Sequence, residues 1–585
     1  MIWMSAIFLP LAVALLLPVP WLGRLARRVL APLVPLPALW LALFGAADSG
    51  ATLDSLVLGL ELGFGPAGQV FLLFTSVLWL VAGVYAQGYF GNLPPSRRFH
   101  GFFLLTMTGN FGLILAQDVP GFYTFFALMT FSAFGLVIYS GTAQAQRAAR
   151  IYLTTAVLGE ALLLGAMFLA VAEADSVMLA DLGAAVARAP QRDLIILLTL
   201  FGFGVKAGAV PVHFWLPLAH PVAPVPASAV LSGAMIKAGL LGWLHFLPLG
   251  HGAFPGWSGF LVVLGLVAAF GAALVGWSQE DPKTTLAYSS ISQMGVMMVI
   301  LGLGLSGPEA WAAAFPVLLL YALNHALAKG ALFFGIGIAL FTGRSRWVPA
   351  LIVAGLAVPA LTLAGAPWTG GSMVKGALKD LAAGLADPVI PWLGWLLPLT
   401  AAATAMLLGR FLWLALCHIR ANPPGGRAHP LMWTGWLALL AGVVIAVAFS
   451  ANYYMLAIMP APGSLAAAWK DAWPILLGLG LLVGLGRVLG GRGRRVAVAP
   501  GDVVLVIERC AVSLRHWWLK QGVVGPWGWN LNLAVPLERL AARERRSDLA
   551  KRLEERMRYR SVPAILFILL VLALVALLLF GTPLQ

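Results

Sequence analysis

The chain has 585 residues, of which 61% are hydrophobic and only 10% are charged. A soluble globular domain is nearer half apolar and a quarter charged, so this composition excludes an ordinary soluble protein. The formal net charge of +15 would fit nucleic-acid binding in a soluble protein, but membrane proteins collect basic residues in their cytoplasmic loops, and we expect no nucleic-acid partner. Two cysteines, Cys417 and Cys510, are too few for an iron–sulfur cluster or a zinc site, so we expect no cofactor and no metal.

Apolar runs long enough to cross a hydrocarbon core of about 30 Å recur along the whole chain. They are continuous and lack the alternation of transmembrane β-strands, which predicts an all-α polytopic membrane protein of about 16 transmembrane helices. The first run lacks the features of a cleaved signal and is interpreted as a span. The eleventh and twelfth runs are too long for one straight crossing, and we expect a break in each. The expected spans are 2–18, 31–47, 69–86, 101–117, 119–139, 151–172, 193–210, 227–247, 257–277, 286–305, 311–341, 348–386, 392–417, 431–451, 473–490 and 562–580.

Charge in the expected loops predicts the orientation, because positive residues gather on the cytoplasmic side. With the N-terminus outside, the inner loops hold Arg24, Arg27, Arg28, Arg97, Arg98, Arg147, Arg150, Lys283, Arg344, Arg346, Arg420 and Arg427. The outer loops then hold Asp48, Asp54, Glu61, Asp118, Glu173, Asp175 and Asp181, with Arg188 and Arg192 as exceptions. This alternation favours an N-out protein of the bacterial inner membrane.

The segment 491–561 is more polar than the rest and ends in a basic, amphipathic stretch. Its apolar positions fall on one helical face, and they are Leu537, Leu540, Leu549 and Leu553. A solvated helix is one interpretation; we favour a helix lying along the cytoplasmic membrane surface or a partner subunit. The last span, 562–580, then returns to the bilayer.

With the charges assigned to loops set aside, we select six ionisable residues inside the expected spans, because such residues at membrane depth commonly mark ion or proton routes. They are Glu160, Lys206, Lys237, His325, Lys329 and Lys375. Lys206 stands five residues before Pro211, and a helix broken by proline at membrane depth is tolerated where it is buried in protein or lines a water-filled cavity. The pattern predicts a titratable amine in contact with water, the alternative being a lysine whose side chain snorkels to the interface.

The other cations lie deeper in their spans. Lys237 is well inside the eighth span, where snorkelling is harder. His325 and Lys329 share one helical face at i, i+4 spacing. Lys375 follows Pro367, Gly370 and Gly371, which predict a second broken helix, and two broken helices in corresponding halves are typical of inverted-repeat transporters.

Three motifs carry a resemblance to a known family: VPVHFWLPLAHPVAPVPASAVLSGAMIKAG at 210–239, DPKTTLAYSSISQMG at 281–295 and LNHALAKGALFFGIG at 323–337. They resemble the antiporter-like ion-translocating subunits shared by respiratory complex I, group 4 membrane hydrogenases of the formate hydrogenlyase type and Mrp-type cation/proton antiporters. The wording of the first motif is closest to the hydrogenase branch. The resemblance covers roughly residues 60–450.

The resemblance implies a fourteen-helix core with two inverted five-helix repeats, broken helices 7 and 12, and a hydrated chain of lysines and histidines along the membrane plane. Lys206 matches the seventh-helix lysine and Lys237 the eighth-helix one; His325 and Lys329 match the eleventh-helix pair, and Lys375 the twelfth-helix lysine near the exit. The implied domains are helices 1–3 at 1–100, a first repeat at 101–247, a second repeat at 257–417, helices 14–15 at 431–490, the amphipathic segment at 491–561 and the final helix at 562–580.

One position departs from the family pattern. The fifth helix of the family usually carries a glutamate that pairs with the seventh-helix lysine, and the corresponding position here is Ala127. The nearest acid is Glu160, one helix later. We expect Glu160 to serve as the counter-charge of Lys206, the alternative being that the first half has lost its ion switch.

The resemblance thus implies a proton-translocating membrane subunit of a larger complex, with other membrane subunits and membrane lipid around it. No redox centre is evident in this chain, so an electron-transfer reaction would reside in a soluble redox or enzyme arm, and whether the whole is an enzyme stays open. Three alternatives also stay open: a Na⁺/H⁺ antiporter module of an Mrp-like assembly, a proton-coupled partner of a soluble enzyme, as in inorganic carbon uptake, and a degenerate structural anchor.

Overall fold

A computed structural model describes residues 1–46, 49–54, 56–57, 59–91, 97–343, 347–385, 391–421, 427–453, 465–490, 498 and 500–501. The chain divides into two compact units, Met1–Ala51 with Glu61–Gly501, and Thr52–Leu60 with Asp502–Gln585. Every helix with described residues belongs to the first unit. The expected amphipathic helix before residue 561 and the expected final span at 562–580 lie outside the described residues.

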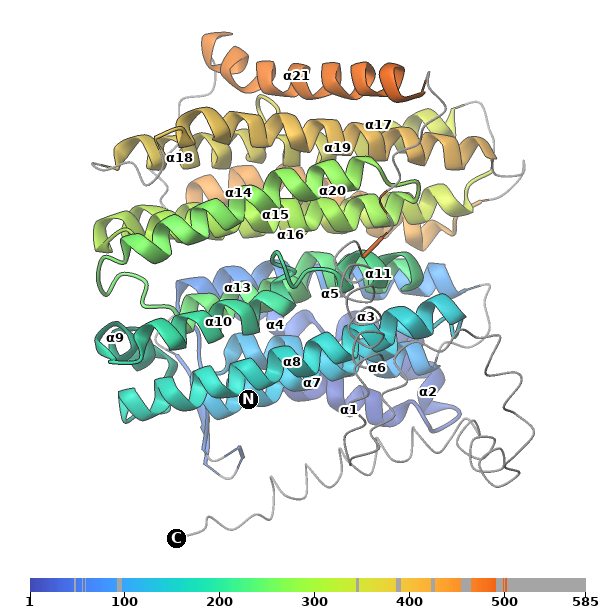
Figure 1. The fold of residues 1–585 in the computed structure, drawn as a ribbon. Helices are drawn as coiled ribbons and strands as arrows, with labels where there is room; N and C mark the ends of the chain where they lie inside the picture. The colour runs from blue at the N-terminus through green and yellow to red at the C-terminus, as the bar shows by residue number, and fades with distance from the viewer. Residues whose placement is uncertain are drawn as a thin grey trace, which may run out of the picture. The chain divides into compact units, whose positions relative to one another are not determined.

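The elements follow one another in chain order as a nearly continuous series of helices (Figure 1). The first part comprises α1 (Ile2–Leu16), α2 (Leu22–Leu25), the π-helical turn η1 (Ala26–Leu30), α3 (Ala31–Leu33), α4 (Leu36–Phe44), the paired strands β1 (Ala51–Leu53) and β2 (Leu60–Leu62), α5 (Pro66–Phe90), α6 (Arg97–Leu115), α7 (Val119–Val137), α8 (Ala143–Ala174), α9 (Leu179–Arg188), α10 (Arg192–Ala207) and α11 (Trp215–Val222). The second part comprises α12 (Val225–Val230), the π-helical turn η2 (Leu231–Met235), α13 (Ile236–Phe246), α14 (Pro255–Trp277), α15 (Pro282–Gly304), α16 (Pro308–Phe341), α17 (Val348–Ala364), α18 (Gly370–Gly384), α19 (Leu393–Ala421), α20 (Pro430–Tyr453) and α21 (Leu465–Gly490).

Ten helical stretches in the described chain are long and apolar enough to cross a membrane, and three shorter apolar helices accompany them. The protein is therefore a multi-pass helical membrane protein. The long stretches are Leu22–Phe44, Pro66–Phe90, Val119–Val137, Ala143–Ala174, Val225–Phe246, Pro255–Trp277, Pro282–Gly304, Pro308–Phe341, Leu393–Ala421 and Ala468–Leu485. The shorter ones are Ile2–Leu16, Val348–Ala364 and Pro430–Ala446. The expected total of about 16 spans stays a prediction.

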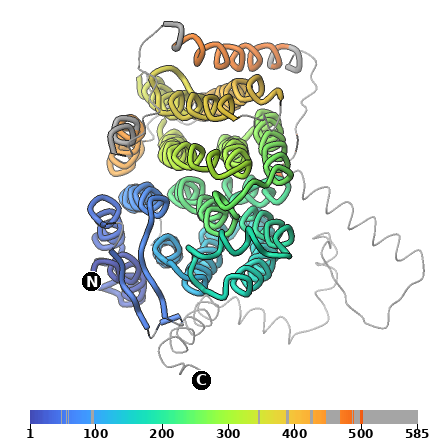
Figure 2. The backbone as a smooth tube through the Cα atoms, turned by 90° about the vertical axis from the view of Figure 1, so that its left-hand side faces the viewer, coloured from blue at the N-terminus to red at the C-terminus, as the bar shows by residue number. Residues whose placement is uncertain are grey.

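The long helices of the first unit run side by side, and Figure 2 shows many of them nearly end-on in successive layers. Close packing depends on small residues: a Cβ on Gly295 of α15 would lie 2.5 Å from the carbonyl oxygen of Gly265 on α14. Every residue of α15 is buried, and α13 and α16 are buried over most of their length. These central helices hold the buried cations away from the surface of the unit.

Two helices are interrupted within the described chain. The first, α10, ends at Ala207 and is followed by Gly208 with φ +70°, before α11 begins at Trp215. The second, α17, ends at Ala364 and is followed by Gly365 with φ +86°, before α18 begins at Gly370. In both cases glycine adopts the left-handed conformation that commonly ends a helix. The break expected in the twelfth span is thus present.

The break expected in the eleventh span is wrong. α16 is one continuous helix of 34 residues, about 51 Å long at 1.5 Å per residue, although Pro316 lies inside it. A single proline removes one backbone hydrogen bond, and the surrounding alanines and leucines are strong helix formers. No left-handed glycine follows, so the helix continues beyond the thickness of the hydrocarbon core.

Several residues expected in loops lie on helices in the structure, among them Arg97 and Arg98 at the start of α6 and Arg147 and Arg150 near the start of α8. Arg24, Arg27 and Arg28 lie on the helical residues of α2 and η1, which begin the candidate span Leu22–Phe44. Lys283 lies in the first turn of α15, because the Asp281 side chain caps this helix by accepting a hydrogen bond of 2.7 Å from the backbone N–H of Thr284. The Lys283 side chain is also buried.

Candidate functional site

Lys206 lies at the C-terminal end of α10 and is buried between α8 and α11. Its ammonium nitrogen donates a hydrogen bond of 3.1 Å to the hydroxyl of Tyr152 on α8. That hydroxyl donates in turn to the carbonyl oxygen of Thr130 on α7, at 2.7 Å. Trp215, the first residue of α11, packs against the Tyr152 ring and donates to the carbonyl oxygen of Val205. The end of the broken helix is therefore fixed by side chains from both of its neighbours.

Glu160 lies two turns after Tyr152 on the same face of α8 and is 5% exposed. It is within electrostatic reach of Lys206, and the side chains of Thr130 and Tyr123 face its carboxylate. Neither carboxylate oxygen has a hydrogen-bond partner among the described residues. Burial without a partner is costly for a carboxylate, so this position requires an opposite charge or a proton.

A small cavity joins the two groups. Glu160, Lys206, Tyr152, Thr130 and Trp215 are among the residues that line it. Its volume, measured as the space open to the centre of a water-sized sphere, is about 10 Å³. This volume is at the lower limit of about 10–15 Å³ that a single water molecule needs.

Lys237 is fully buried and follows the π-helical turn η2 directly. The sequence places Lys237 well inside the eighth span, and the structure has a helical path there with one wide turn. The Lys237 ammonium donates 2.8 Å to the carbonyl oxygen of Ser232, a residue of that turn. π-helical turns inside α-helices occur frequently at functional sites.

The second group in contact with Lys237 is His325 of α16. The Lys237 ammonium nitrogen lies 2.6 Å from Nδ1 of His325, and both side chains are fully buried. Two titratable groups from different helices, 88 residues apart in sequence, thus share one hydrogen bond. The other ring nitrogen of His325, Nε2, has no hydrogen-bond partner in the described chain.

Lys329 lies one turn after His325 on α16 and is also fully buried. It donates 2.9 Å to the carbonyl oxygen of Leu286 on α15. His220 of α11, which sequence reasoning did not select, is fully buried, stacks on Phe333 of α16, and is within electrostatic reach of both Lys329 and Lys283. His220 therefore lies near the central cations, on the helix that follows the first break.

Lys283 is a second residue that sequence reasoning missed. Its ammonium donates to the carbonyl oxygens of Pro221 and Ala223, at the end of α11. These carbonyls lie where the chain leaves one helix and enters the next, and a cation there complements the negative end of the helix. The Asp-Pro pair at 281–282 was the available signal, because it marks a helix start and not a loop.

A buried polar chain continues from α16 toward α19. The Tyr321 hydroxyl donates 2.7 Å to the side-chain oxygen of Gln293 on α15, whose amide donates 3.0 Å to the hydroxyl of Thr404 on α19. Tyr321, His325 and Lys329 follow one another at four-residue spacing and share one face of α16. Neutral hydrogen-bonding groups therefore extend the cation row along the core.

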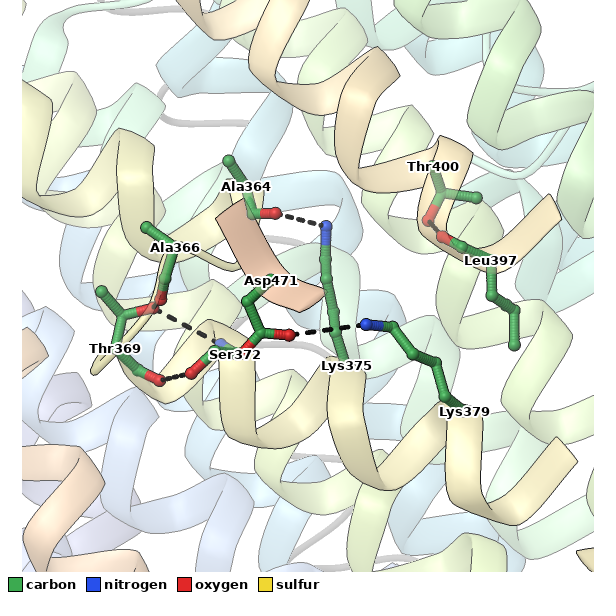
Figure 3. Close-up of polar contacts among 9 residues, drawn as sticks. All are labelled: Ala364, Ala366, Thr369, Ser372, Lys375, Lys379, Leu397, Thr400 and Asp471. Atoms are coloured by element: carbon green, nitrogen blue, oxygen red, sulfur yellow. Dashed lines mark hydrogen bonds and ion pairs between the residues drawn. The ribbon is translucent and has the colours of Figure 1, made fainter. Parts of the chain in front are cut away.

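Lys375 lies in the second turn of α18, after the second break (Figure 3). Its ammonium donates 3.2 Å to the carbonyl oxygen of Ala364, the last residue of α17. The backbone amides of Gly365 and Ala366 turn back to other carbonyls of α17, which leaves this carbonyl for the lysine. The end of a broken helix thus binds a cation directly, as half-helix carbonyl ends do in transporters.

The structure brings the six predicted residues into three groups. Lys206 and Glu160 line one cavity, Lys237 contacts His325 with Lys329 a turn away, and Lys375 lies apart at the second break. No hydrogen bond between described residues joins one group to the next. Among the residues that the structure describes, no three His, Cys, Asp or Glu converge on a possible metal site. The expectation of a chain without cofactors stays a prediction.

Comparison with known proteins shows which proteins this chain is similar to. Residues 116–378 match the family described as NADH:quinone oxidoreductase/Mrp antiporter, transmembrane region. This segment is therefore similar to the membrane domain of that family. The matched segment contains all six predicted residues, from Glu160 to Lys375.

Curated relatives of the antiporter-like domain include hydrogenase-4 component B of Escherichia coli K12, which is 32% identical over 46% of this chain and 41% of the relative. The Na⁺/H⁺ antiporter subunit A1 of Staphylococcus aureus is 30% identical over 56% of this chain and 44% of the relative. The chain aligns with less than half the length of either protein. By their names, these relatives are components or subunits of larger assemblies.

Two solved structures share the fold. The Mrp complex from Dietzia sp. DQ12-45-1b contains a chain that superposes with a TM-score of 0.69 at 22% identity, over 100% of this chain and 63% of that one. A chain of an archaeal respiratory membrane complex, the membrane-bound sulfane sulfur reductase, superposes with a TM-score of 0.63 at 19% identity, over 82% of this chain and 98% of that one. The protein therefore has the same fold as these two chains.

Proposed function

We propose that this protein is a proton-translocating, antiporter-like membrane subunit of a larger complex, and that protons move through its buried lysines and histidines. The observation that carries the proposal is the contact between Lys237 and His325, two fully buried titratable groups 2.6 Å apart. Ionisable residues at membrane depth are rare and commonly mark proton relays.

The contact limits how many protons the pair can hold. Two positive charges 2.6 Å apart would repel each other by about 6 kcal/mol at an effective dielectric constant of about 20. One proton is therefore shared, either on the lysine with Nδ1 accepting or on Nδ1 with the amine accepting. A second proton that arrives at one side drives the first away toward the other, which is the elementary step of a relay.

The pair of Glu160 and Lys206 controls the proton transfer between Lys237 and His325. Glu160 and Lys206 line the same cavity, so an ionised carboxylate stabilises the charged lysine, and a protonated or displaced carboxylate releases it. We propose that Glu160 replaces the acid that the family carries at the position of Ala127. His220 and Lys283 extend the row beside α11, and Lys375 ends it at the second break.

The finer architecture belongs to the same proposal. Two interrupted helices, each ended by a left-handed glycine and each next to a buried lysine, support two inverted repeats with broken helices 7 and 12. About 16 spans, a bacterial inner-membrane location and an external N-terminus remain part of this proposal.

The partners follow from the relatives, which are named as a hydrogenase component and an antiporter subunit. We propose other membrane subunits, with a soluble redox or enzyme arm as the energy source. A Na⁺/H⁺ antiporter module is the alternative that the second relative favours. The subunits that copurify with the chain in mild detergent separate these possibilities.

The test compares His325→Leu with a matched control, His418→Leu, since His418 is an exposed histidine at the end of α19. Proton movement is followed with a pH-sensitive dye in everted membrane vesicles, with and without Na⁺. His325→Leu removes the acceptor of the Lys237 proton and abolishes proton movement, whereas His418→Leu leaves it intact. Proton movement at the wild-type rate in His325→Leu would refute the relay. A strict requirement for Na⁺ in the wild type would favour the antiporter alternative.

A further inference from the structure

Lys375 has a neighbour on its own helix that sequence reasoning did not consider. Lys379 lies four residues later, on the same face of α18. Its ammonium nitrogen lies 3.5 Å from a carboxylate oxygen of Asp471, which comes from α21, 92 residues further along the chain (Figure 3). The carboxylate is also within electrostatic reach of Lys375. Two lysines therefore face one acid at the second helix break.

The position of Asp471 is set by the packing of α21. Ile475, one turn after Asp471, is buried against Ala364 and Ala366 of the second break and Ala405 of α19. Gly478, one turn later, approaches the backbone of α19 so closely that a Cβ there would clash with the carbonyl of Ala402. One face of α21 thus lies on the break itself, and the same face carries the acid.

Asp471 is an unusual residue for an apolar helix. It belongs to Ala468–Leu485, a stretch that is apolar and long enough to cross a membrane. A carboxylate inside such a stretch is costly, faces the bundle and usually has a function. The partly exposed ion pair with Lys379 adds little stability by itself, so holding α21 in place does not account for the acid. Asp471 also lies outside residues 116–378, the segment that matches the family.

We propose that Asp471 is the acidic partner of Lys375 and Lys379, and that α21 thereby completes the terminal site of the proton row. This inference rests on the proposed function. The carboxylate can neutralise one lysine at a time. When it pairs with Lys379, the only partner of the Lys375 ammonium is the Ala364 carbonyl oxygen. When it pairs with Lys375, it stabilises the protonated form of that lysine. Asp471 is a positioning residue for the proton on Lys375, in the role that Glu160 has for Lys206.

The test uses the assembled complex in vesicles and compares Asp471→Asn, Asp471→Glu and the control Asp380→Asn, which removes an exposed acid of α18. We expect Asp471→Asn to slow proton movement by about tenfold or more, the effect of losing one charge-assisted contact. Asp471→Glu restores movement to within about twofold of the wild type, since it restores the charge. Asp380→Asn leaves the rate unchanged.

Further experiments separate a role of Asp471 in proton movement from a role in holding the structure together. Thermal unfolding in detergent and the yield of assembled complex are measured for each variant, and Lys379→Asp is combined with Asp471→Lys to restore the ion pair with its charges exchanged. The exchange restores assembly but not proton movement, because a lysine at 471 cannot neutralise Lys375. Restoration of both, or wild-type movement in Asp471→Asn, would overturn the inference. If His325→Leu also moves protons normally, the proposed function fails as well; if His325→Leu is inactive, only the role of Asp471 fails.

Discussion

At the scale of single residues, Glu160 shows how a membrane helix holds an acid. Its two carboxylate oxygens are buried without hydrogen-bond partners among the described residues, and the nearest opposite charge is Lys206 across a cavity the size of one water molecule. A permanent, well-made ion pair would hold these groups in direct contact. The gap between them lets the strength of the interaction change, as a switch requires.

The first prediction concerns this acid. Glu160→Gln keeps the size of the side chain and removes its charge, so Lys206 loses the group that stabilises its protonated form. We expect proton movement in vesicles to fall by about tenfold or more, with the assembled complex still present. Glu173→Gln is the matched control, because Glu173 is exposed on the same helix. Equal rates in Glu160→Gln and Glu173→Gln would contradict the assignment of Glu160.

The sequence predicts the buried cations that lie deep in apolar runs, because charge within such a run stands out. It does not predict their contacts. In the sequence, nothing distinguishes Tyr152 from other aromatic residues of the spans. Lys283 lies at the edge of its expected span, where a lysine is commonly in a loop. Asp471 and Lys379 were also missed: Asp471 stands just before the expected span 473–490, and only the packing of α21 on the second break brings it to Lys379.

At the scale of elements, the contrast between α16 and the α17–α18 pair separates a proline that a helix tolerates from a true break. α16 contains Pro316 and continues. α17 also contains a proline, Pro359, and continues through it, but it ends where Gly365 adopts a left-handed conformation. Span length alone led to the wrong expectation for α16, whereas a cluster of Pro and Gly correctly predicted the break before Lys375.

The second prediction tests that break. Gly365→Ala places a Cβ at φ +86°, which costs about 1–2 kcal/mol, and the new atom would lie 2.9 Å from Cδ of Lys375. We expect a lower midpoint of thermal unfolding in detergent and slower proton movement, since the lysine must leave its carbonyl. Gly376→Ala is the control: this helical glycine has open space around it, and alanine there stabilises the helix by up to about 1 kcal/mol. The account of the break is wrong if the two variants behave alike.

At the scale of the whole molecule, composition and span length predict an all-α membrane protein, and the fold agrees. Hydrophobicity along the chain is a local property, so it can be recognised in the sequence alone. The pairing of helices is not local: α8 meets α10, α15 meets α16, and α21 reaches the second break from 92 residues away. The resemblance of the motifs to a known family implies the row of lysines and histidines, but it does not predict the contact of α21 with the second break.

The most direct test of the central claim is the rate of proton movement by the purified complex in proteoliposomes when Lys237 is replaced. Lys237→Met removes the charge and keeps the apolar stem, and Lys470→Met, at an exposed lysine of α21, is its control. We predict that Lys237→Met lowers the rate by about 100-fold, as expected when a positioned proton carrier is lost, while Lys470→Met retains the wild-type rate. A folded, assembled Lys237→Met complex that moves protons at the wild-type rate would contradict the account.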